Sequence, residues 1–372
     1  MRKKIIFIQP SFAHYRYDLF EELDNLFDVT FVFVNKNKTS EYQYPSTTKV
    51  NSKWKVKYLY GEFNRFWFWN LYKLLIKTNP EAVVCSIPGS IQSIVTSIAK
   101  KIKKIPFVLY TESWSDNRIN NKNICKRLVR KCINKFVLNS VSCIVCGGTR
   151  SQEYYSRIGF DNKKIFKAYQ CTHDVSQHPT DLTFKKKKQV NILYFSRIVT
   201  SKGLDVLIKA FSNIHKSYPD ICLTIVGDGP EKNKYEILAQ NENIDDITFV
   251  GAVNNEDAYQ YYYQSDIYVL PCNGVGRGEA WGLVLNEATS MSLPIITTNV
   301  VGATGDLVIN GLNGYVIEAN DIGALEEALI KLICSEELRK KMGQESRKLF
   351  DRINNPKKSA YQFLNAIQSM NL

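Results

Sequence analysis

Residues 190–211 read Val190-Asn-Ile-Leu-Tyr-Phe-Ser-Arg197-Ile-Val-Thr-Ser-Lys202-Gly-Leu-Asp-Val-Leu-Ile-Lys-Ala-Phe211. The first six residues combine β-branched and aromatic side chains, as a buried strand does. From residue 204 onward, apolar residues recur at three- and four-residue spacing, which is typical of one face of a helix. We therefore predict a strand, a short loop that carries Arg197 and Lys202, and an amphipathic helix.

Further units of the same kind fill the rest of the sequence. Short β-branched or aromatic runs predict strands at 5–8, 29–34, 55–60, 82–85, 107–110 and 143–146, and again at 190–195, 221–226, 247–250, 267–270 and 294–297. Amphipathic patterns predict helices in the first half at 16–26, 66–77, 90–101 and 122–139. Strands that alternate with helices are typical of parallel sheets covered on both faces.

The predicted architecture is α/β, with two doubly wound, Rossmann-like domains facing a central cleft. A length of 372 residues also favours two domains. We assign residues 1–175 to the first domain and 190–350 to the second. The segment 176–189 between them is polar, basic and contains Pro179, which suits an exposed linker. A C-terminal helix at 351–372 can cross back to the first domain.

Composition excludes several classes of protein. With 44% hydrophobic and 23% charged residues, the chain is neither disordered, collagenous nor a coiled coil. Its apolar runs, such as residues 5–8, are far shorter than the ~20 residues of a membrane-spanning helix. The same run is too short for the core of a secretory signal. Cys143, Cys146 and other cysteines lie in strand-like apolar runs, so we predict reduced core residues in a cytosolic protein.

Positive charge is concentrated in the first half of the sequence. Residues 1–172 contain 29 Lys and Arg against 12 Asp and Glu, whereas residues 173–372 contain 20 against 24. This asymmetry favours a polyanionic partner, either nucleic acid or an anionic membrane surface. Residues 118–135 carry seven cations and no acid on a helical pattern with apolar positions, and 100–104 and the aromatic run 63–69 lie nearby in sequence. Basic amphipathic stretches of this type suit an anionic membrane surface.

Candidate ligand-binding residues follow the predicted strands, because open parallel sheets bind ligands at the carboxyl ends of their strands. Arg197 and Lys202 come between a strand and a helix N-terminus, where cations and free backbone N–H groups suit a diphosphate. Residues 227–230, Gly-Asp-Gly-Pro, follow the next strand, and Pro230 predicts the first helical position. Glu279 is expected in a loop, and Glu287 inside a helix that begins near Gly282.

Five motifs follow one another in the second half of the chain: Ser196-Arg197…Lys202-Gly203, Val226-Gly-Asp-Gly-Pro230, Phe249-Val-Gly-Ala-Val253, Glu279-x7-Glu287 and Gly311-Leu-Asn-Gly314. Together they resemble the retaining GT-B glycosyltransferases of family 4, over residues 190–320. The resemblance implies that the second domain holds a nucleotide-sugar donor.

The resemblance also implies a role for each residue. Arg197 and Lys202 would neutralise the diphosphate, and Glu279 would complete the catalytic set by facing the sugar hydroxyls beside the anomeric carbon. Glu287 would accept hydrogen bonds from the ribose. The other donor-binding residues, largely through backbone groups near the base, phosphates and sugar, would be Gly227, Asp228, Gly251, Val253, Ala280, Trp281, Gly282 and Leu283.

The first half departs from the family pattern. His14 and Arg16 follow the first strand where many relatives have a glycine-rich loop, and Glu112 stands where many have a histidine. With Arg150, which follows the strand at 143–146, they are the candidate acceptor-binding residues. Glu112 would hydrogen-bond the acceptor or assist its deprotonation. A plain loop carboxylate is the alternative.

No Asp-x-Asp occurs, which is the usual metal clamp of glycosyltransferases with the other common fold. We therefore expect no metal and no cofactor, with Arg197 and Lys202 acting in place of a metal ion. The predicted function is retaining transfer of a sugar from a UDP- or GDP-sugar to a saccharide acceptor, for which a polyprenyl-diphosphate-linked form is expected. The predicted context is bacterial surface polysaccharide assembly at the inner face of the cell membrane.

Two alternatives remain open from the sequence. One is a sugar-nucleotide epimerase or a sugar-phosphate-acceptor transferase of the same fold. The other is a basic nucleic-acid-binding protein, motivated by a pI of about 9.1. No recognised nucleic-acid-binding module is present in the sequence, so nucleic acid is not an expected partner.

Overall fold

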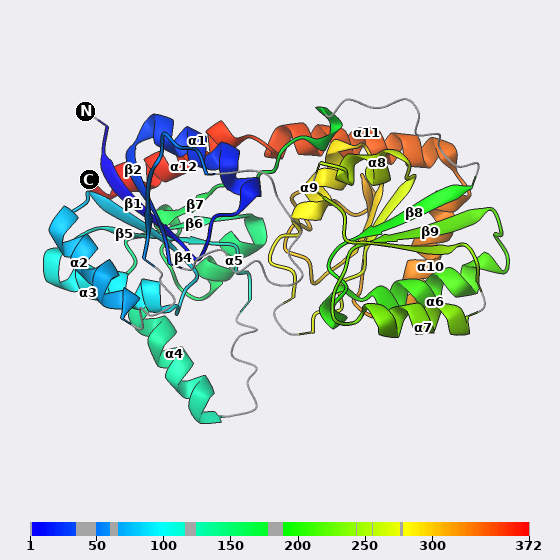
Figure 1. Cartoon of the computed structure of the whole chain (residues 1–372), viewed down its shortest axis with the longest axis horizontal. Coiled ribbons are helices and arrows are strands. Elements are labelled where there is room, and N and C mark those ends of the chain that lie inside the picture. The colour runs from blue at the N-terminus through cyan, green and yellow to red at the C-terminus, as the bar shows by residue number, and fades with distance from the viewer. Residues whose placement is uncertain are drawn as a thin grey trace. The chain divides into compact units, whose positions relative to one another are not determined.

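The computed structural model describes residues 2–34, 50–59, 66–115, 124–177, 189–242, 244–254, 256–275 and 278–371. Contacts divide the chain into two compact units (Figure 1). The first unit comprises the described residues up to Cys171 and continues from Asn355, and the second runs from Thr172 to Asn354. Most of the predicted linker, 176–189, lies outside the described residues.

The first unit is built on a seven-stranded parallel sheet in the order β3-β2-β1-β4-β5-β6-β7. Its strands are β1 (Lys4–Gln9), β2 (Asp28–Phe33), β3 (Lys55–Tyr58), β4 (Ala82–Ser86), β5 (Phe107–Thr111), β6 (Cys143–Cys146) and β7 (Ile165–Lys167). The six predicted strands are confirmed to within two residues at each end. The three-residue strand β7 was not predicted.

Helices cover both faces of the first sheet, because alternate strand residues point to opposite sides. On one face, Phe7 and Val84 pack with Phe20 of α1 (Tyr17–Leu26) and Phe363 of α12 (Pro356–Gln368). On the other, Ile6 and Ile8 pack with residues of α2 (Trp67–Thr78), α3 (Ile91–Lys103), α4 (Ile124–Leu138) and α5 (Thr149–Arg157). The helix α12 thus contributes to the core of the first unit, although it follows the second unit in sequence.

The second unit is built on a six-stranded parallel sheet in the order β10-β9-β8-β11-β12-β13. Its strands are β8 (Val190–Phe195), β9 (Ile221–Val226), β10 (Ile247–Gly251), β11 (Ile267–Leu270), β12 (Ile295–Thr298) and β13 (Gly314–Ile317). Its helices are α6 (Leu204–His215), α7 (Lys232–Asn241), α8 (Ala258–Tyr263), α9 (Leu283–Ser290), α10 (Ile322–Ile333) and α11 (Glu336–Ile353). The five strands predicted for this half are confirmed.

One predicted helix start is wrong. The helix α7 begins at Lys232, and Pro230 lies in the turn before it. The turn is fixed by Gly229, where a Cβ atom would lie 2.1 Å from the carbonyl oxygen of Ile198. This close packing of two backbone segments delays the start of the helix by two residues.

Two predictions from composition can be compared with the structure. None of the described helices combines the length and the apolar character needed to cross a bilayer. All nine cysteines are free, and the five that lie in or beside strands, Cys85, Cys143, Cys146, Cys222 and Cys272, are buried. Their burial confirms that they are core residues.

Candidate functional site

The loop after β8 carries the two predicted cations. It runs through η5 (Thr200–Lys202) to Gly203, which has a positive φ of 67°. A Cβ atom on Gly203 would lie 1.9 Å from the carbonyl oxygen of Pro271, just after β11. Glycine is required here because the two strand-end segments touch through their backbones. In this loop Arg197 is exposed and Lys202 is buried.

Lys202 forms an ion pair with Glu279. Its Nζ donates to Oε2 of Glu279, from the loop that follows β11. Burial lowers the pKa of Lys202, and the positive charge of Arg197 lowers it further. The sequence predicts a diphosphate contact for Lys202 and a sugar contact for Glu279. In the structure the Lys202 ammonium pairs with the Glu279 carboxylate, so the two predicted contacts are adjacent.

Backbone contacts fix the loop that carries Glu279. The backbone N–H of Gly302 donates to the carbonyl of Glu279 at 2.9 Å, and that of Ala303 donates to the carbonyl of Trp281 at 3.2 Å. The Trp281 side chain is buried, and its Nε1 donates to Oδ1 of Asn286 at 2.8 Å. Trp281 is therefore an anchor for the loop, and only its backbone remains for the predicted donor contact.

The helix α9 begins after Gly282, as predicted, and places Glu287 on its second turn. The Tyr262 hydroxyl on α8 donates to Oε2 of Glu287 at 2.6 Å. The Tyr262 ring is buried and stacks on Phe195, with ring centroids 5.1 Å apart. Burial raises the pKa of Glu287 to about 7, although the hydrogen bond from Tyr262 lowers it. Tyr262 thus holds the carboxylate in a fixed orientation.

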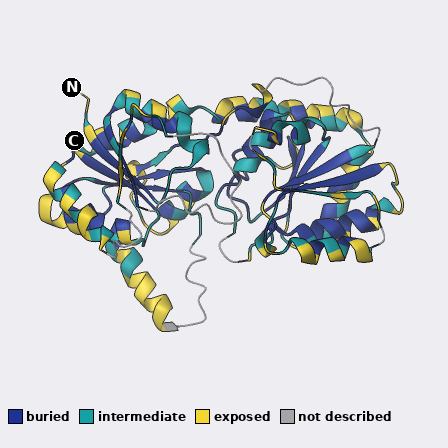
Figure 2. Ribbon diagram, viewed as in Figure 1, coloured by how far each residue is buried: buried dark blue, intermediate teal, exposed yellow. Residues whose placement is uncertain are grey.

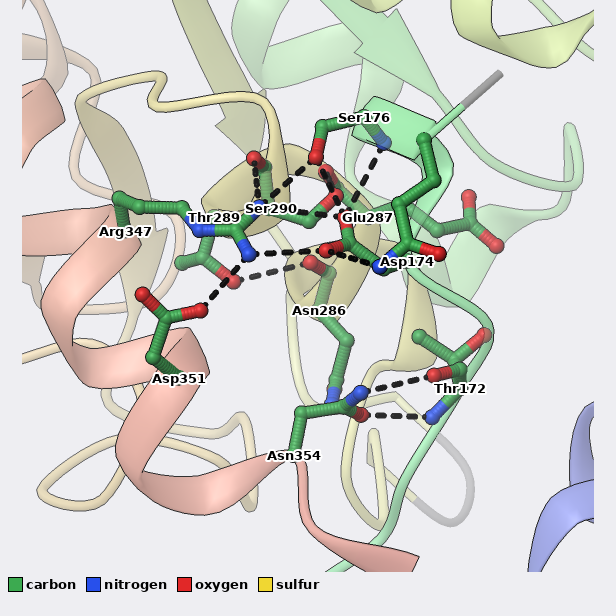
Figure 3. A network of polar contacts seen from close by, with 11 residues as sticks. Thr172, Asp174, Ser176, Asn286, Glu287, Thr289, Ser290, Arg347, Asp351 and Asn354 are labelled. Carbon is green, nitrogen blue, oxygen red and sulfur yellow. Dashed lines mark hydrogen bonds and ion pairs between the residues drawn. The ribbon is translucent and has the colours of Figure 1, made fainter.

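A second polar network secures the C-terminal end of α9 (Figure 3). The Arg347 guanidinium on α11 donates to both carboxylate oxygens of Asp174, at 3.1 and 2.8 Å, and to the carbonyl of Ser290 at 3.0 Å. These hydrogen bonds to Asp174, together with Asp351, raise the pKa of Arg347 against the effect of burial. The network therefore ties the helix of Glu287 to the segment where the chain enters the second unit.

The loops that follow β9 and β10, which contain Gly227 and Gly251, meet the loop after β8 at the same edge of the sheet. The backbone N–H of Gly227 donates to the carbonyl of Gly251 at 2.9 Å, and that of Ile198 donates to the carbonyl of Asp228 at 2.8 Å. The carboxyl ends of β8, β9, β10 and β11 are thus joined by their loops. Of the other predicted donor-binding residues, Val253 and Leu283 are half-buried, and Ala280 lies beside Glu279.

In the first unit, two of the predicted acceptor-binding residues meet. Arg16 Nη2 donates to Oε1 of Glu112 at 2.7 Å, its Nη1 donates to Gln9, and its guanidinium lies 5.2 Å from the Tyr110 ring centroid. Burial opposes the charge on Arg16, but Tyr15, Tyr110 and Glu112 together raise its pKa. Gln9, at the end of β1, was not predicted.

The other two predicted residues of the first unit, Arg150 and His14, contact aromatic rings. The Arg150 guanidinium lies 4.5 Å from the centroid of the Trp114 ring, and burial lowers the pKa of Arg150. The His14 ring packs edge-on against Tyr15 at 5.7 Å, and burial lowers the pKa of His14. His14 is therefore biased toward its neutral form.

Comparison with known proteins finds a family match within the second unit. Residues 180–349 match the family described as Glycosyl transferases group 1. The chain is 34% identical over 160 residues to the capsular polysaccharide biosynthesis glycosyltransferase CapM of Staphylococcus aureus. The aligned residues cover 42% of this chain and 40% of CapM. The chain is 28% identical over 160 residues to a GDP-mannose-dependent alpha-(1-6)-phosphatidylinositol monomannoside mannosyltransferase of Mycolicibacterium smegmatis, 42% of each. The chain thus spans about two fifths of the length of these curated relatives.

Solved structures extend the likeness to both units. The fold resembles that of Alr3699/HepE from Anabaena in complex with UDP, with a TM-score of 0.74 and 15% identity over 98% of this chain and 100% of that chain. Sucrose-phosphate synthase from Thermosynechococcus elongatus gives a TM-score of 0.75 at 18% identity, over 99% of each chain. These likenesses confirm the predicted GT-B fold with two Rossmann-like units.

Proposed function

Because residues 180–349 match the glycosyl transferases group 1 family, we propose that the protein is a retaining glycosyltransferase that takes its sugar from a nucleotide-sugar donor. The observation that carries this proposal is the set of charges at one edge of the second sheet. Arg197, Lys202 and Glu279 come from loops that share backbone contacts, and Glu287 is held by Tyr262 on the adjoining helix. In this proposal the two cations meet the diphosphate, Glu279 faces the sugar and Glu287 faces the ribose of the nucleotide sugar.

The cations would act on the leaving group. When the bond between the sugar and the diphosphate breaks, negative charge grows on the phosphate that departs. Lys202 is buried, so its ammonium acts in a medium of low dielectric, where it stabilises developing charge more than it would in water. Arg197 is exposed and can contact two phosphate oxygens at once. Glu279 would orient the sugar beside Lys202, since the two side chains are already paired.

We propose that transfer proceeds without a metal ion, with the two cations in its place. EDTA treatment is expected to leave transfer activity unchanged. Loss of activity on chelation, followed by recovery with added Mg²⁺ or Mn²⁺, would contradict this proposal. Activity with EDTA and with each metal, measured as release of nucleoside diphosphate in the presence of acceptor, is the direct check.

The proposed donor is a UDP- or a GDP-linked sugar. Alr3699/HepE has been solved with UDP-glucose, whereas the mycobacterial relative is named as GDP-mannose-dependent. A thermal-shift panel of UDP- and GDP-sugars separates the two, because a ligand present at 100 times its Kd adds about 2.7 kcal/mol to the free energy of unfolding. Stabilisation by neither class would contradict the donor site.

The first unit is the proposed acceptor domain, with Glu112 as the group that hydrogen-bonds the acceptor hydroxyl. The ion pair with Arg16 orients this carboxylate at the end of β5. A polyprenyl-diphosphate-linked saccharide at the inner face of the membrane is the proposed acceptor, and surface polysaccharide assembly is the proposed role. CapM is named for capsular polysaccharide biosynthesis, which supports this role. Sugar-nucleotide epimerisation, the alternative, would proceed without an acceptor.

The affinity for nucleoside diphosphate is expected to decrease as the pH falls through about 7. In the proposed role Glu287 must be ionised to accept hydrogen bonds from both ribose hydroxyls, and burial raises the pKa of Glu287 to about 7. Tyr262→Phe removes the hydrogen bond that lowers this pKa, so the decrease should move to higher pH. Calorimetric titrations at a series of pH values measure the shift.

Two variants control the pH experiment. Tyr268→Phe removes a hydroxyl from the neighbouring ring, which donates to the Phe195 carbonyl at 3.0 Å rather than to Glu287, and should leave the pH profile in place. Glu287→Gln retains the titration of the ligand phosphates and should lose the remaining pH dependence. Superimposable profiles for wild type and Tyr262→Phe would refute the role of Tyr262.

A further inference from the structure

Three helices of the first unit lie side by side over one face of its sheet. The helix α3 packs against both α2 and α4. Each helix contributes a buried residue to the same core cluster: Leu71 from α2, Val95 from α3 and Val137 from α4. The outward residues of α2 and α3 are exposed, and on α4 every residue from 125 to 132 is exposed (Figure 2). We call the exposed residues of 66–78, 91–104 and 125–138 the α2–α4 face.

The α2–α4 face carries only positive charge. The three helices contain no Asp or Glu. The exposed cations are two on α2, three at the end of α3 and five on α4: Lys73, Lys77, Lys101, Lys103, Lys104, Lys126, Arg127, Arg130, Lys131 and Lys135. By contrast, α1 on the opposite side of the sheet contains four acids, Asp18, Glu21, Glu22 and Asp24. The helix α12 on that same side adds two lysines, Lys357 and Lys358, so α1 and α12 together carry two cations and four acids. The two sides of the sheet therefore differ in charge.

Large apolar side chains are exposed on the same face. Seven of the thirteen exposed large hydrophobic residues in the described part of the chain lie there: Phe66, Trp69, Ile91, Ile98, Ile102, Leu128 and Val129. On α4, Leu128 and Val129 are 55% and 59% exposed. They share a stripe with Cys125 and Cys132, at helical spacing, and cations lie on both sides of it. Apolar residues rimmed by polar ones mark an interaction surface.

We propose that the α2–α4 face docks the protein on an anionic lipid bilayer. The inference rests on the lipid-linked acceptor of the proposed function and names the surface that would meet the membrane. Lysine and arginine side chains attract anionic headgroups, while aliphatic side chains enter the boundary between headgroups and acyl chains. Trp69 and Phe66 are residues of the type that occupies the interface. Basic and apolar groups on one surface fit a bilayer, which offers both a negative charge and an apolar interior.

A second copy of the chain fits this face less well. Symmetric pairing would bring the same surface of two protomers together. Ten exposed cations would then meet ten others, with no acid on the three helices to compensate. Nucleic acid offers negative charge but no apolar layer for Ile98, Ile102 and Val129. The bilayer is the partner that matches both properties.

The structure also refines the predicted surface. Lys100 is half-buried and donates to Oγ of Ser142 at 2.6 Å, and burial lowers its pKa, so it is not one of the docking cations. The Lys101 Nζ lies 4.5 Å from the centroid of the Phe136 ring and links α3 to α4. Arg118, Lys122 and Phe63 lie outside the described residues.

Co-sedimentation with vesicles tests the proposal on the full chain. The wild type should bind phosphatidylglycerol–phosphatidylcholine vesicles and not pure phosphatidylcholine, and it should dissociate as salt rises from about 0.1 to about 0.5 M. Replacing Lys126, Arg127, Arg130 and Lys131 with Gln should weaken binding by roughly 10²-fold or more. The matched control replaces four exposed lysines of the second unit, Lys209, Lys331, Lys340 and Lys341, and should bind as the wild type does.

A second pair of substitutions separates docking from general attraction between charges. Leu128→Ser with Val129→Ser keeps the net charge and should still reduce vesicle binding by about tenfold, because buried apolar area contributes to interfacial affinity. Equal loss in the control quadruple variant, or no loss in either α4 variant, would overturn the proposal. So would dimerisation of the wild type that the α4 variants abolish, or tighter binding to RNA than to vesicles.

These measurements are independent of sugar transfer. Sedimentation needs neither donor nor acceptor, so a protein that docks without transferring sugar would leave this inference standing and refute the proposed function. A protein that transfers sugar to a soluble acceptor and ignores anionic vesicles would do the reverse. The substituted residues are exposed, and far-UV circular dichroism shows whether each variant is folded.

Discussion

Lys202→Ala is expected to slow sugar transfer by roughly 10²-fold or more, which is the scale for removing a preorganised transition-state partner. Lys202 is buried beside Glu279, so its ammonium acts in a medium of low dielectric, where the loss of a charge has a large effect. Single-turnover rates at saturating donor measure the effect on the chemical step.

Arg197→Ala should have an effect of the same order, and it avoids one ambiguity of the first variant. Removal of Lys202 leaves Glu279 without its counter-charge and can therefore disturb the fold, whereas Arg197 is exposed. Lys209→Ala on α6 is the control, because Lys209 is an exposed cation of the same unit that forms no part of the site. Rates for Arg197→Ala and Lys202→Ala within twofold of wild type would refute the role of both cations.

The two glutamates should give different kinetic signatures, and this is the second large effect expected. Glu279→Gln should reduce turnover by roughly 10²-fold, since contacts beside the anomeric carbon matter most when positive charge develops there. Its affinity for the bare nucleoside diphosphate should change little. Glu287→Gln should weaken binding of both the nucleotide sugar and the nucleoside diphosphate, because the ribose is common to the two ligands.

Calorimetry with the nucleoside diphosphate alone separates the two roles. A large loss of affinity in Glu279→Gln, with none in Glu287→Gln, would invert the assignment. The ion pair between Lys202 and Glu279 also affects the expected affinity of Glu279→Gln. Because Lys202 pairs with Glu279, Glu279→Gln also frees the ammonium, so an unchanged or slightly higher affinity for the diphosphate is consistent with the assigned roles.

The sequence predicted the elements whose local pattern is strong. Strands such as β8 and β9 are six-residue runs rich in apolar residues, with β-branched or aromatic side chains, and the loops that follow them carry the motifs. Short elements with few apolar positions were missed, as with β7, which has three residues. Pro230 misled the prediction because the packing of Gly229 on Ile198, which delays α7, is a tertiary contact.

The site was predictable in its charges and unpredictable in its pairings. Arg197, Lys202 and Glu279 lie in loops that follow strands, Glu287 lies on the second turn of α9, and sequence motifs record that order. The contact between Arg347 and Asp174 joins residues 173 positions apart, and no local pattern signals it. Tyr262 lies in a run of three tyrosines at 261–263, and only the packing of α8 shows which one reaches Glu287. Partners that act through tertiary contact need the structure.

The return of α12 to the first unit has a consequence for the order in which the protein is made. A ribosome delivers the chain from the N-terminus, and domains generally fold as they emerge. The first sheet can form early, but Phe363 and Ile367 belong to its core and are synthesised only after the whole second unit. Until then an apolar strip beside α1 remains open to water. The first unit should therefore complete its folding last, and a nascent chain stopped before residue 356 should expose a surface that chaperones recognise.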